Sequence, residues 1–451
     1  MKPTVNRREF IKLAGAGIGA LTLNGLLGCG SESKSGGQPN VVILFADDLG
    51  YGDLSCYGHP TIQTPNLDRM ADEGIRLTSF YAQPSCSPSR ASLLTGKYPL
   101  RASMPHVLGP NSDHALPQSE LTLAEGLKSQ GYQTQMVGKW HLGHAEEEHL
   151  PTSRGFDHYF GLLYSNDMKP PWVNTEKPLE LYRDNEPIEH PVNQDTLTTR
   201  YTKESVQFIE NASSDAPFLL YMAYSMPHLP LHTADTFRET SRAGLYGDII
   251  ETIDWSAGQI LQAIKDKGVD ENTIVVFTSD NGPWSNMPPR MLQEGIRPWH
   301  AGWSGLLRGA KHMTYEGGPR VPGIVRWPGQ IPAGQESADI ASTMDIFNTM
   351  MNLGGAEVPA DVDGKDLLAF LKGESESPAK QFYYFSGSTI HGVRDAEWKL
   401  RIAEGYPELF NLDIDPAERH NRAEELPDIV SRLQTLIEEK AQETDADLPE
   451  A

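Results

Sequence analysis

The side chains best suited to chemistry stand directly after four apolar runs of the sequence. These endings are Ala46-Asp47-Asp48, Gly138-Lys139-Trp140-His141, Pro227-His228 and Ser279-Asp280-Asn281-Gly282. In an open parallel sheet, the ligand crevice lies at the carboxyl ends of the strands. A single ending of this kind is common, because Asp and Asn also cap turns and helices. Four such endings together predict a functional site.

Oxygen atoms are the only metal ligands that four of these side chains offer. The four are Asp47, Asp48, Asp280 and Asn281. Such a set suits a hard cation, Ca²⁺ or Mg²⁺, better than zinc. Protonatable groups would surround the ion, namely Lys139, His141, His228 and Lys311. The pattern therefore predicts one hard-metal site bordered by acids and bases.

A cysteine opens the second constellation, Cys86-Ser87-Pro88-Ser89-Arg90-Ala91-Ser92-Leu93-Leu94-Thr95-Gly96-Lys97. Cys86 precedes a helix that Pro88 leads and Gly96 ends, and a helix N-terminus favours anions. A nucleophilic thiol needs a lowered pKa and a nearby base, yet a hard-metal site is an unusual place for a soft thiolate. A buried structural cysteine is the more common fate of a lone thiol. Residue types alone leave both interpretations open.

Buried parallel strands are expected to position these groups. They are Asn40–Ala46, Gln133–Val137, Pro217–Tyr224 and Thr273–Thr278. Helical patterns alternate with them, from Pro65 to Gly74 and over Thr122–Gln130, Thr198–Asn211, Ile249–Lys267 and Ile340–Leu353. The alternation predicts an α/β fold over residues 40–355, a doubly wound and mostly parallel sheet with helices on both faces.

The pattern changes after Gly354-Gly355. Short segments follow, which are Gln381–Phe385, Gly392–Arg394, Lys399–Ile402 and Glu408–Leu412, and then a helix over Pro427–Ala441. Short strands in succession are typical of an antiparallel sheet. We therefore expect residues 356–451 to form a smaller C-terminal α+β subdomain.

Charge narrows the classes of function. The 451 residues include 61 acidic and 38 basic side chains, a formal net charge of −23. This charge repels phosphate backbones and anionic lipid surfaces, so no nucleic-acid partner is expected. An anionic substrate would need a local cluster of basic groups or a metal. The three cysteines, Cys29, Cys56 and Cys86, allow at most one disulfide, so oxidation does not hold the fold together.

Residues 1–28 have the outline of a twin-arginine export signal. Arg7-Arg8 precede a weakly apolar stretch, Leu13–Leu27, which is too short to span a bilayer. The ending Leu26-Leu27-Gly28-Cys29 resembles a bacterial lipoprotein cleavage box, with Cys29 as the lipid-bearing terminus. Residues 29–39 fit a flexible tether. We expect a periplasmic or cell-surface protein that meets the membrane only through a lipid anchor; an ordinary cleaved signal is the alternative.

The segment Cys86–Gly96 resembles the signature of formylglycine-dependent (type I) sulfatases, in which the cysteine is oxidised to an aldehyde. The resemblance continues through Asp47-Asp48-Leu49-Gly50, Gly138-Lys139-Trp140-His141, Ser279-Asp280-Asn281-Gly282 and Gly309-Ala310-Lys311. Tyr164-Ser165-Asn166-Asp167 and Trp303-Ser304-Gly305 lean toward the arylsulfatase A-like branch. The resemblance to the sulfatase family runs from about Asn40 to the C-terminal helix. This resemblance implies an alkaline-phosphatase-like fold and hydrolysis of sulfate monoesters.

The same resemblance implies a role for each site residue. Formylglycine (3-oxoalanine) made from Cys86 would supply the attacking hydroxyl, held by Ca²⁺ on Asp47, Asp48, Asp280 and Asn281, with Mg²⁺ as the alternative ion. Asp280 would also take the proton of that hydroxyl, and Arg90 would steady the modified residue. Lys139, Ser165, His228 and Lys311 would bind the sulfate, and His228 and Lys311 would protonate the leaving oxygen. His141 would deprotonate the second hydroxyl, which expels sulfate.

Substrate and partners follow from the same resemblance. Sulfated polysaccharide fragments or aryl sulfates are the expected substrates, and a formylglycine-generating maturation enzyme is an expected partner. His300 is predicted to bind substrate at a rim to which His232, Trp284, Trp299 and Trp303 could contribute, because aromatic faces stack on sugars. Cys56 is expected to be a packed thiol.

Two other functions compete with this interpretation. The same architecture serves phosphoester and phosphonate hydrolases, against which the motif around Cys86 argues. A surface lipoprotein could also bind sulfated glycans without turnover, if Cys86 is never oxidised. This second alternative predicts an unmodified thiol at position 86, whereas a sulfatase requires an aldehyde there.

Overall fold

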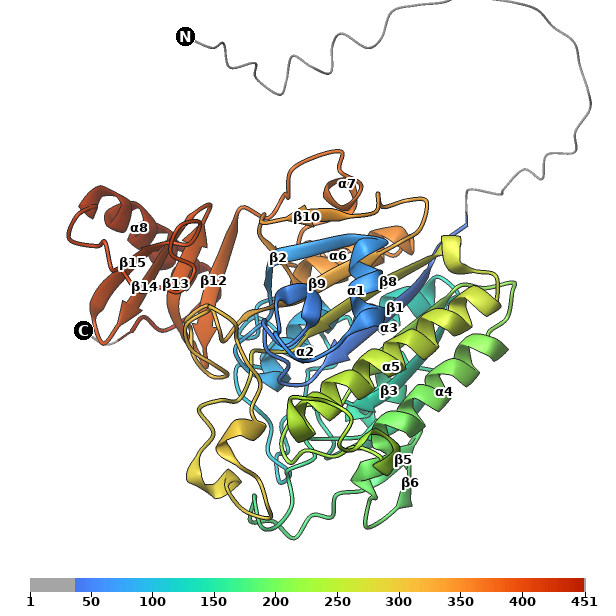
Figure 1. The fold of residues 1–451 in the computed structure, drawn as a ribbon. Helices are drawn as coiled ribbons and strands as arrows, with labels where there is room; N and C mark the ends of the chain where they lie inside the picture. The colour runs from blue at the N-terminus through green and yellow to red at the C-terminus, as the bar shows by residue number, and fades with distance from the viewer. Residues whose placement is uncertain (1–36, 450–451) are drawn as a thin grey trace, which may run out of the picture. The chain divides into compact units, whose positions relative to one another are not determined.

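A mixed sheet forms the centre of the computed structural model, which describes residues 37–449 (Figure 1). Its strands are β1 (Asn40–Ala46), β2 (Ile75–Tyr81), β3 (Gln133–Lys139), β4 (His158–Leu162), β5 (Leu181–Arg183), β6 (Glu186–Glu189), β7 (Phe218–Ala223), β8 (Thr273–Ser279), β9 (Arg320–Arg326), β10 (Gln335–Ser337) and β11 (Ala341–Ser342). They lie in the order β10-β2-β9-β8-β1-β7-β3-β4-β5-β6, and β11 also pairs with β2. All four predicted strands are confirmed as β1, β3, β7 and β8.

These four strands are neighbours and run parallel. β1 lies between β8 and β7, with Ile43 opposite Val276 on one side and Tyr221 on the other. β7 in turn pairs with β3. Every residue of β1, β7 and β8 is buried, because helices cover both faces of the sheet. The four polar endings therefore meet at one edge, as the sequence predicts.

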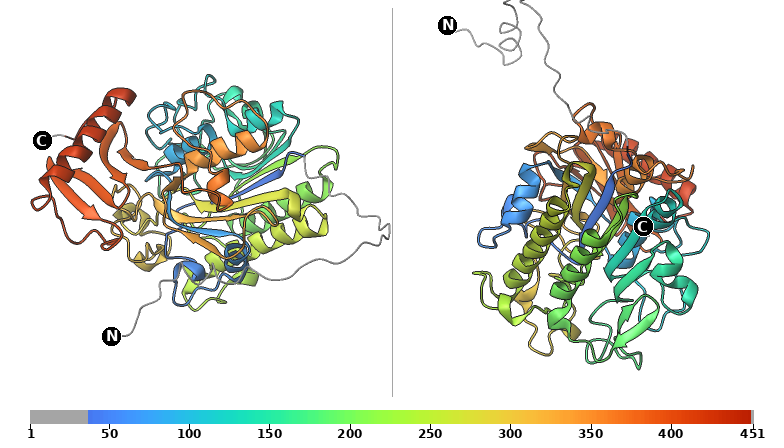
Figure 2. Two further views of the ribbon diagram at one scale, coloured as in Figure 1. Left: turned by 90° about the horizontal axis from the view of Figure 1, so that it is seen from above. Right: turned by 90° about the vertical axis from the view of Figure 1, so that its right-hand side faces the viewer.

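Helices cover the two faces of the sheet (Figures 1 and 2). They are α1 (Pro65–Asp72), α2 (Cys86–Thr95), α3 (Leu123–Ser129), α4 (Leu197–Asn211), α5 (Gly244–Asp266), α6 (Thr343–Leu353) and α7 (Leu368–Leu371). α1 and α4 pack against α5 on one face, and α2 and α3 pack against α6 on the other. The predicted fold class, an α/β sheet between two helical layers, is confirmed.

Several element boundaries differ from the predicted ones. α2 begins at Cys86, so the cysteine lies in the first turn rather than before a helix led by Pro88. α5 begins at Gly244, five residues before the predicted start, because the Asp248 carboxylate accepts the N–H groups of residues 239–241 and supports this turn. The helix predicted from Ile340 begins at Thr343, since the preceding residues pair with β2 as β11. β9, which was not predicted, runs antiparallel to β8 and β2.

A second, antiparallel sheet follows near the C-terminus, as expected. It contains β12 (Gln381–Ser386), β13 (Thr389–Asp395), β14 (Trp398–Ala403) and β15 (Tyr406–Asn411) in that order, and α8 (Pro427–Thr444) packs on it. The boundary expected between residues 355 and 356 stays a prediction. The signal segment, Cys29 and the tether up to residue 36 lie outside the described residues. Within residues 37–449, no helix combines the length and the apolar character that a membrane span requires.

A buried charge cluster joins the two sheets. Nζ of Lys399, on β14, lies 3.0 Å from Oε1 of Glu316 and 2.7 Å from Oε1 of Glu418. It also donates to the carbonyl oxygen of Thr314 at 2.9 Å. Burial opposes ionisation of Glu316, but the charges of Lys399 and Arg320 outweigh it and hold the pKa of Glu316 well below its usual range. The C-terminal sheet therefore holds the segment 314–316 through Lys399, together with Tyr384, which donates to Oε1 of Glu316, and Arg401, which donates to Oγ1 of Thr314.

We expect Lys399→Met to lower the free energy of unfolding by about 3–5 kcal/mol, because it leaves the buried carboxylate of Glu418 without its cation and removes the nearer of the two cations paired with Glu316. Chemical denaturation of both proteins measures the difference. Lys380→Met is the matched control, since the Lys380 side chain is exposed and pairs with the exposed Glu376. A loss below about 1 kcal/mol in Lys399→Met, the value of a surface pair, would contradict the account.

Candidate active site

Opposite charges are paired and buried where β1, β3 and β8 end. Nζ of Lys139 lies 2.9 and 2.8 Å from the two carboxylate oxygens of Asp47. Nζ of Lys311 donates to Oδ1 of Asp48 at 2.6 Å. Each of these side chains is no more than 3% exposed. The edge of the sheet thus holds cations and carboxylates that water does not reach.

Arg90 extends this cluster from α2. Its Nη2 donates to Oδ2 of Asp280 at 2.8 Å and lies 3.5 Å from Oδ1 of Asp47. Its Nη1 donates to the carbonyl oxygen of Lys139 at 2.8 Å. Arg90 is fully buried, so α2 is tied to the ends of β1, β3 and β8 by one guanidinium group.

Unusual backbone conformations aim the side chains at this edge. Asp48 has φ of 67° and His141 has φ of 62°, in the left-handed region that Asp and His tolerate better than most residues. The N–H of Asp48 donates to Oδ1 of Asp280 at 3.0 Å. At Gly138, φ is 106° and an added Cβ would lie 1.7 Å from the carbonyl oxygen of Ala223. Only glycine therefore permits β3 to approach β7 just before Lys139.

The cluster sets the ionisation of its members. Burial opposes the charged form of Asp47, but Lys139 and the other nearby cations lower its pKa well below the usual range. Burial likewise opposes protonation of Lys311, but the carboxylate of Asp48 outweighs it and raises the pKa of the ammonium group. For Asp280, burial and the charge of Asp47 raise the pKa to about 7. Its partner Asp48 thus favours the charged form of Lys311.

Cys86 lies in the first turn of α2 and is 2% exposed. Burial raises the pKa of its thiol, and this effect exceeds the opposing attraction of Lys139 and Lys311. An uncharged thiol is a poor nucleophile, because the thiolate is the reactive form. Cys86 as it stands is therefore not set up for attack through sulfur.

His141 presents an unprotonated ring nitrogen to the interior. Its Nε2 lies 2.8 Å from the carbonyl oxygen of Leu108, which can only accept, so Nε2 carries the proton. Nδ1 is buried and has no hydrogen-bond partner among residues 37–449. Burial, reinforced by the charge of Lys139, lowers the pKa of His141 well below its usual value. The ring is neutral, with its lone pair on Nδ1.

His228 has the opposite arrangement. Its Nδ1 lies 2.6 Å from the carbonyl oxygen of Leu229 and 3.1 Å from Oδ1 of Asn166, so Nδ1 is a donor. Nε2 then lies 3.3 Å from Oγ of Ser165 and 3.7 Å from Oδ2 of Asp48. Trp284 packs beside it, with ring centroids 5.3 Å apart, and Nζ of Lys311 lies 4.7 Å from the centroid of the same indole. Nε2 of His228 is thus directed to the charge cluster.

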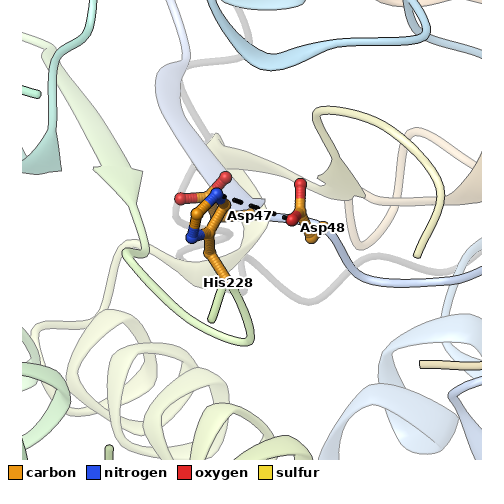
Figure 3. Close-up of side chains that lie close together, drawn as sticks. All are labelled: Asp47, Asp48 and His228. Atoms are coloured by element: carbon orange, nitrogen blue, oxygen red, sulfur yellow. Dashed lines mark ion pairs between the residues drawn. The ribbon is translucent and has the colours of Figure 1, made fainter. Parts of the chain in front are cut away.

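Metal-ligand spacing occurs at Asp47, Asp48 and His228, whose ligand atoms lie within 4.8 Å of one another (Figure 3). Oδ2 of Asp48 itself and Oδ1 of the neighbouring Asn281 are buried without a hydrogen-bond partner in the described part of the chain. Nδ2 of Asn281 donates to Oδ1 of Asp48 at 2.7 Å, which leaves its oxygen available. Unpartnered buried oxygens are rare, and a cation would satisfy them.

The backbone of Lys311 and of the next residue is held by two hydrogen bonds to other loops. The N–H of Lys311 donates to the carbonyl oxygen of Pro283 at 3.0 Å, and the N–H of His312 donates to that of Pro84 at 2.7 Å. His312 has φ of 68°. Farther along, Lys399 of the C-terminal sheet binds the carbonyl oxygen of Thr314. The smaller sheet therefore helps to place Lys311 beside the segment before Cys86.

The structure brings together most of the residues predicted for the site. Those within the cluster are Asp47, Asp48, Cys86, Arg90, Lys139, His141, Ser165, His228, Asp280, Asn281 and Lys311. His300 instead lines a separate cavity with His232, and Trp303 packs against His59 with ring centroids 5.6 Å apart. Lys97 pairs with Glu120 and Asp361. Sequence reasoning missed Asn166 as the partner of His228, although Asn166 lies next to the predicted Ser165.

Comparison with known proteins agrees with this geometry. Residues 39–356 match the family described as Sulfatase, and residues 308–443 match the family described as N-sulphoglucosamine sulphohydrolase, C-terminal. Mouse (Mus musculus) arylsulfatase G is 41% identical over 420 residues, which cover 85% of this chain and 79% of the relative. Mouse N-acetylgalactosamine-6-sulfatase is 37% identical and covers 93% of this chain and 88% of the relative.

Solved structures agree as well. The PsFucS1 sulfatase from Pseudoalteromonas sp. superposes with a TM-score of 0.81 at 30% identity, covering 91% of each chain. Ps i-CgsB in complex with κ-ι-κ-neocarrahexaose superposes with a TM-score of 0.77 at 28% identity, covering 90% of this chain and 93% of that one. With this family match, these relatives and the charge cluster around Cys86, the chain belongs to the sulfatase family.

Proposed function

We propose that this enzyme releases inorganic sulfate from sulfate monoesters of carbohydrates, and also from aryl sulfates. The observation that carries the proposal is the buried cluster beside Cys86, in which Arg90, Lys139 and Lys311 offset three carboxylates in a chain of net charge −23. A bound divalent cation would leave this cluster with a net positive charge. A sulfate ester is an anion, and a site that binds one must outweigh the charge of the whole protein locally. The names of the relatives, which include N-acetylgalactosamine-6-sulfatase, support a sulfated sugar as substrate.

We propose that Ca²⁺ and formylglycine are the resident groups, with Mg²⁺ as the other candidate ion. Asp47, Asp48, Asp280 and Asn281 would hold the ion, because they supply oxygen atoms and two of those atoms have no other described partner. When bound, Ca²⁺ would neutralise charge on the sulfate, and formylglycine at position 86 would supply an oxygen nucleophile in place of sulfur. The neutral, buried thiol of Cys86 fits a precursor better than a nucleophile.

The residues of the chain supply electrostatic stabilisation and proton transfer. The ammonium groups of Lys139 and Lys311 are fixed before substrate arrives, so little reorganisation is needed when charge develops on the sulfate oxygens. Ser165 lies between Lys139 and His228, 3.3 Å from each, and its hydroxyl can donate to the same oxygens. Arg90 acts through Asp280, whose carboxylate it orients.

Two histidines have complementary proton roles. Nδ1 of His228 is occupied by the carbonyl oxygen of Leu229, so a second proton on Nε2 would face the charge cluster and could pass to the leaving oxygen. Nδ1 of His141, which has no hydrogen-bond partner among residues 37–449, can accept a proton. The two rings therefore work as acid and base because their backbone partners fix opposite tautomers.

We further propose, from the sequence of residues 1–39, that the enzyme is exported by the twin-arginine route and tethered by lipid on Cys29. A maturation enzyme that oxidises Cys86 would then be a required partner. Tethering outside the cytoplasm would place the enzyme next to polymeric sulfated glycans, which favours these over small aryl sulfates.

Release of sulfate by the matured enzyme tests the proposed reaction directly. Protein matured in its own host and loaded with Ca²⁺ should release sulfate from at least one member of a panel containing sulfated mono- and oligosaccharides and an aryl sulfate. Cys86→Ala should lose this activity, because alanine cannot yield the aldehyde. Ion chromatography of sulfate measures both. Phosphate and phosphonate esters belong in the panel, and faster turnover of those would favour the phosphoester alternative.

A panel on which the matured wild type and Cys86→Ala are equally inactive would refute the proposal. Retained binding of sulfated glycans by Cys86→Ala, without any turnover by the wild type, would favour the glycan-binding lipoprotein.

Binding of Ca²⁺ should raise the stability of the folded protein. Ca²⁺ at about 100 times its dissociation constant should stabilise the wild type by about 2.7 kcal/mol, because it binds only the folded site. Thermal denaturation with and without Ca²⁺ measures the change. Asp48→Asn should abolish it, since Oδ2 of Asp48 is one of the two buried oxygens of the cluster that lack a partner among residues 37–449. Asp235→Asn, at a fully exposed aspartate, is the control and should keep the full response.

A Ca²⁺ response of equal size in Asp48→Asn and in the wild type would place the ion elsewhere.

Substrates with different leaving groups separate a role of His228 as general acid from a role in binding sulfate. His228→Asn should lower kcat/KM about 10²- to 10⁴-fold on a sugar sulfate, whose alkoxide leaving group needs a proton. The loss on 4-nitrophenyl sulfate should be much smaller, because that leaving group departs as a stable anion. Steady-state kinetics on both substrates measures the ratio. Equal losses on the two substrates would show that His228 only binds sulfate.

A further inference from the structure

The cavity lined by His300 and His232 has a volume of about 540 Å³ and lies outside the charge cluster. Its walls come from residues 169–172, 230–232 and 294–296, together with Leu245 and His300. This volume lies within the range of small-molecule sites. None of the catalytic roles proposed above uses a residue of these walls, although the sequence predicts His300, with His232, at a substrate rim.

The cavity is connected to the active site through Asn166. Nδ2 of Asn166 donates to the carbonyl oxygen of Pro230, in the cavity wall, at 3.0 Å. Its Oδ1 lies 3.1 Å from Nδ1 of His228. Along the chain, Ser165 precedes Lys169 by four residues and His228 precedes Pro230 by two. The cavity wall is therefore linked to His228 by one residue, Asn166, and is close in sequence to both Ser165 and His228.

Two polar groups of the walls lack partners. The ammonium group of Lys169 forms no ion pair or side-chain hydrogen bond within residues 37–449, and lies 5.9 Å from the centroid of the Trp172 ring. Trp172 is 8% exposed, and its Nε1 is buried with no acceptor among the same residues. An indole N–H can only donate, and a buried donor without an acceptor is rare. A ligand with oxygen acceptors would give the N–H of Trp172 a partner and could replace water at the half-buried ammonium group of Lys169.

The remaining walls fit a sugar ring. Leu231, Leu245 and Ile296 supply apolar surface, and prolines and the ring of His300 supply flat faces. His232 is engaged by Asp195 at 2.8 Å, and Glu294 is the one carboxylate in the wall. A pyranose ring presents apolar C–H faces and a rim of hydroxyl groups, which matches this mixture.

We propose that this cavity binds the sugar ring next to the sulfated ring, and that Lys169 favours a neighbour with a carboxylate or sulfate. The proposal rests on the proposed function, since it concerns a substrate held by its sulfate at the cluster around Cys86. Trp172 donates its N–H to a hydroxyl group of the second ring. The enzyme thus acts faster on acidic oligosaccharides than on the isolated sulfated sugar.

The test uses three substrates with the same sulfated ring, chosen as the sugar that the matured wild type hydrolyses fastest. One is the monosaccharide, one a disaccharide with a neutral second ring, and one a disaccharide with a uronate second ring. The wild type should show a kcat/KM about tenfold higher on the uronate disaccharide than on the monosaccharide, the factor expected of one charge-assisted hydrogen bond.

Variants of Lys169 and Trp172 test whether these residues cause the difference in kcat/KM between the substrates. Lys169→Gln should reduce the ratio of kcat/KM between the uronate disaccharide and the monosaccharide about tenfold, mainly through KM. Trp172→Phe, which keeps the ring and removes the N–H, should reduce the ratio for both disaccharides. Lys177→Gln is the matched control on the same segment, because Lys177 is exposed and lies outside the cavity walls. It should behave as the wild type.

Three results would overturn the subsite. They are equal kcat/KM of the wild type on all three substrates, an unchanged ratio in Lys169→Gln, and an equal loss on all three substrates in Lys169→Gln, which would indicate a structural role. A wild type that releases sulfate from none of them fails the proposed function instead, so the two failures are distinguishable.

Discussion

The structure depends on one electrostatic constraint, which is that the charges of the active site are buried together and can exist only as a set. Asp47, Asp48 and Asp280 face Lys139, Lys311 and Arg90 at the ends of β1, β3 and β8 and on the elements beside them. An isolated buried charge costs several kcal/mol, and its loss of a partner costs about as much. Every element that carries one of these groups must therefore be positioned at the same time.

This requirement explains the arrangement of the surrounding fold. β1 lies between β7 and β8, which brings Asp47 and Asp280 to one edge, and Gly138 lets β3 approach closely enough to bring Lys139. Arg90 reaches the same edge from α2, so the helix that begins at Cys86 is fixed by its own second turn. The C-terminal sheet holds the loop of Lys311 through Lys399. Cys86, an uncharged group, lies where these elements converge.

Much of this site could be predicted from sequence. Asp47, Asp48, His228, Asp280 and Asn281 follow apolar runs, and strand order then places them together. The role of Cys86 depended on the family resemblance, because residue types alone fit a structural thiol equally well. The large sheet and the antiparallel C-terminal sheet were also predicted, since apolar runs and short alternating segments depend on local sequence.

Features set by distant contacts could not be predicted. The proton on His141 is assigned by the carbonyl oxygen of Leu108, and that of His228 by Leu229 and Asn166. β9 joins the sheet antiparallel, which short apolar runs do not reveal. The placement of Trp303 and His300 away from the charge cluster depends on the loop over residues 284–307, whose course follows from tertiary contacts such as the N–H of Gly52 on the carbonyl oxygen of Trp303.

The most direct test of the central claim is the chemical state of residue 86 in protein isolated from its own host. Mass spectrometry of the peptide that contains this residue should find an aldehyde or its hydrate, which a hydrazide reagent captures. This result would show that the buried, neutral thiol is the precursor of an oxygen nucleophile. An unmodified cysteine at position 86 in protein that releases sulfate would contradict the account.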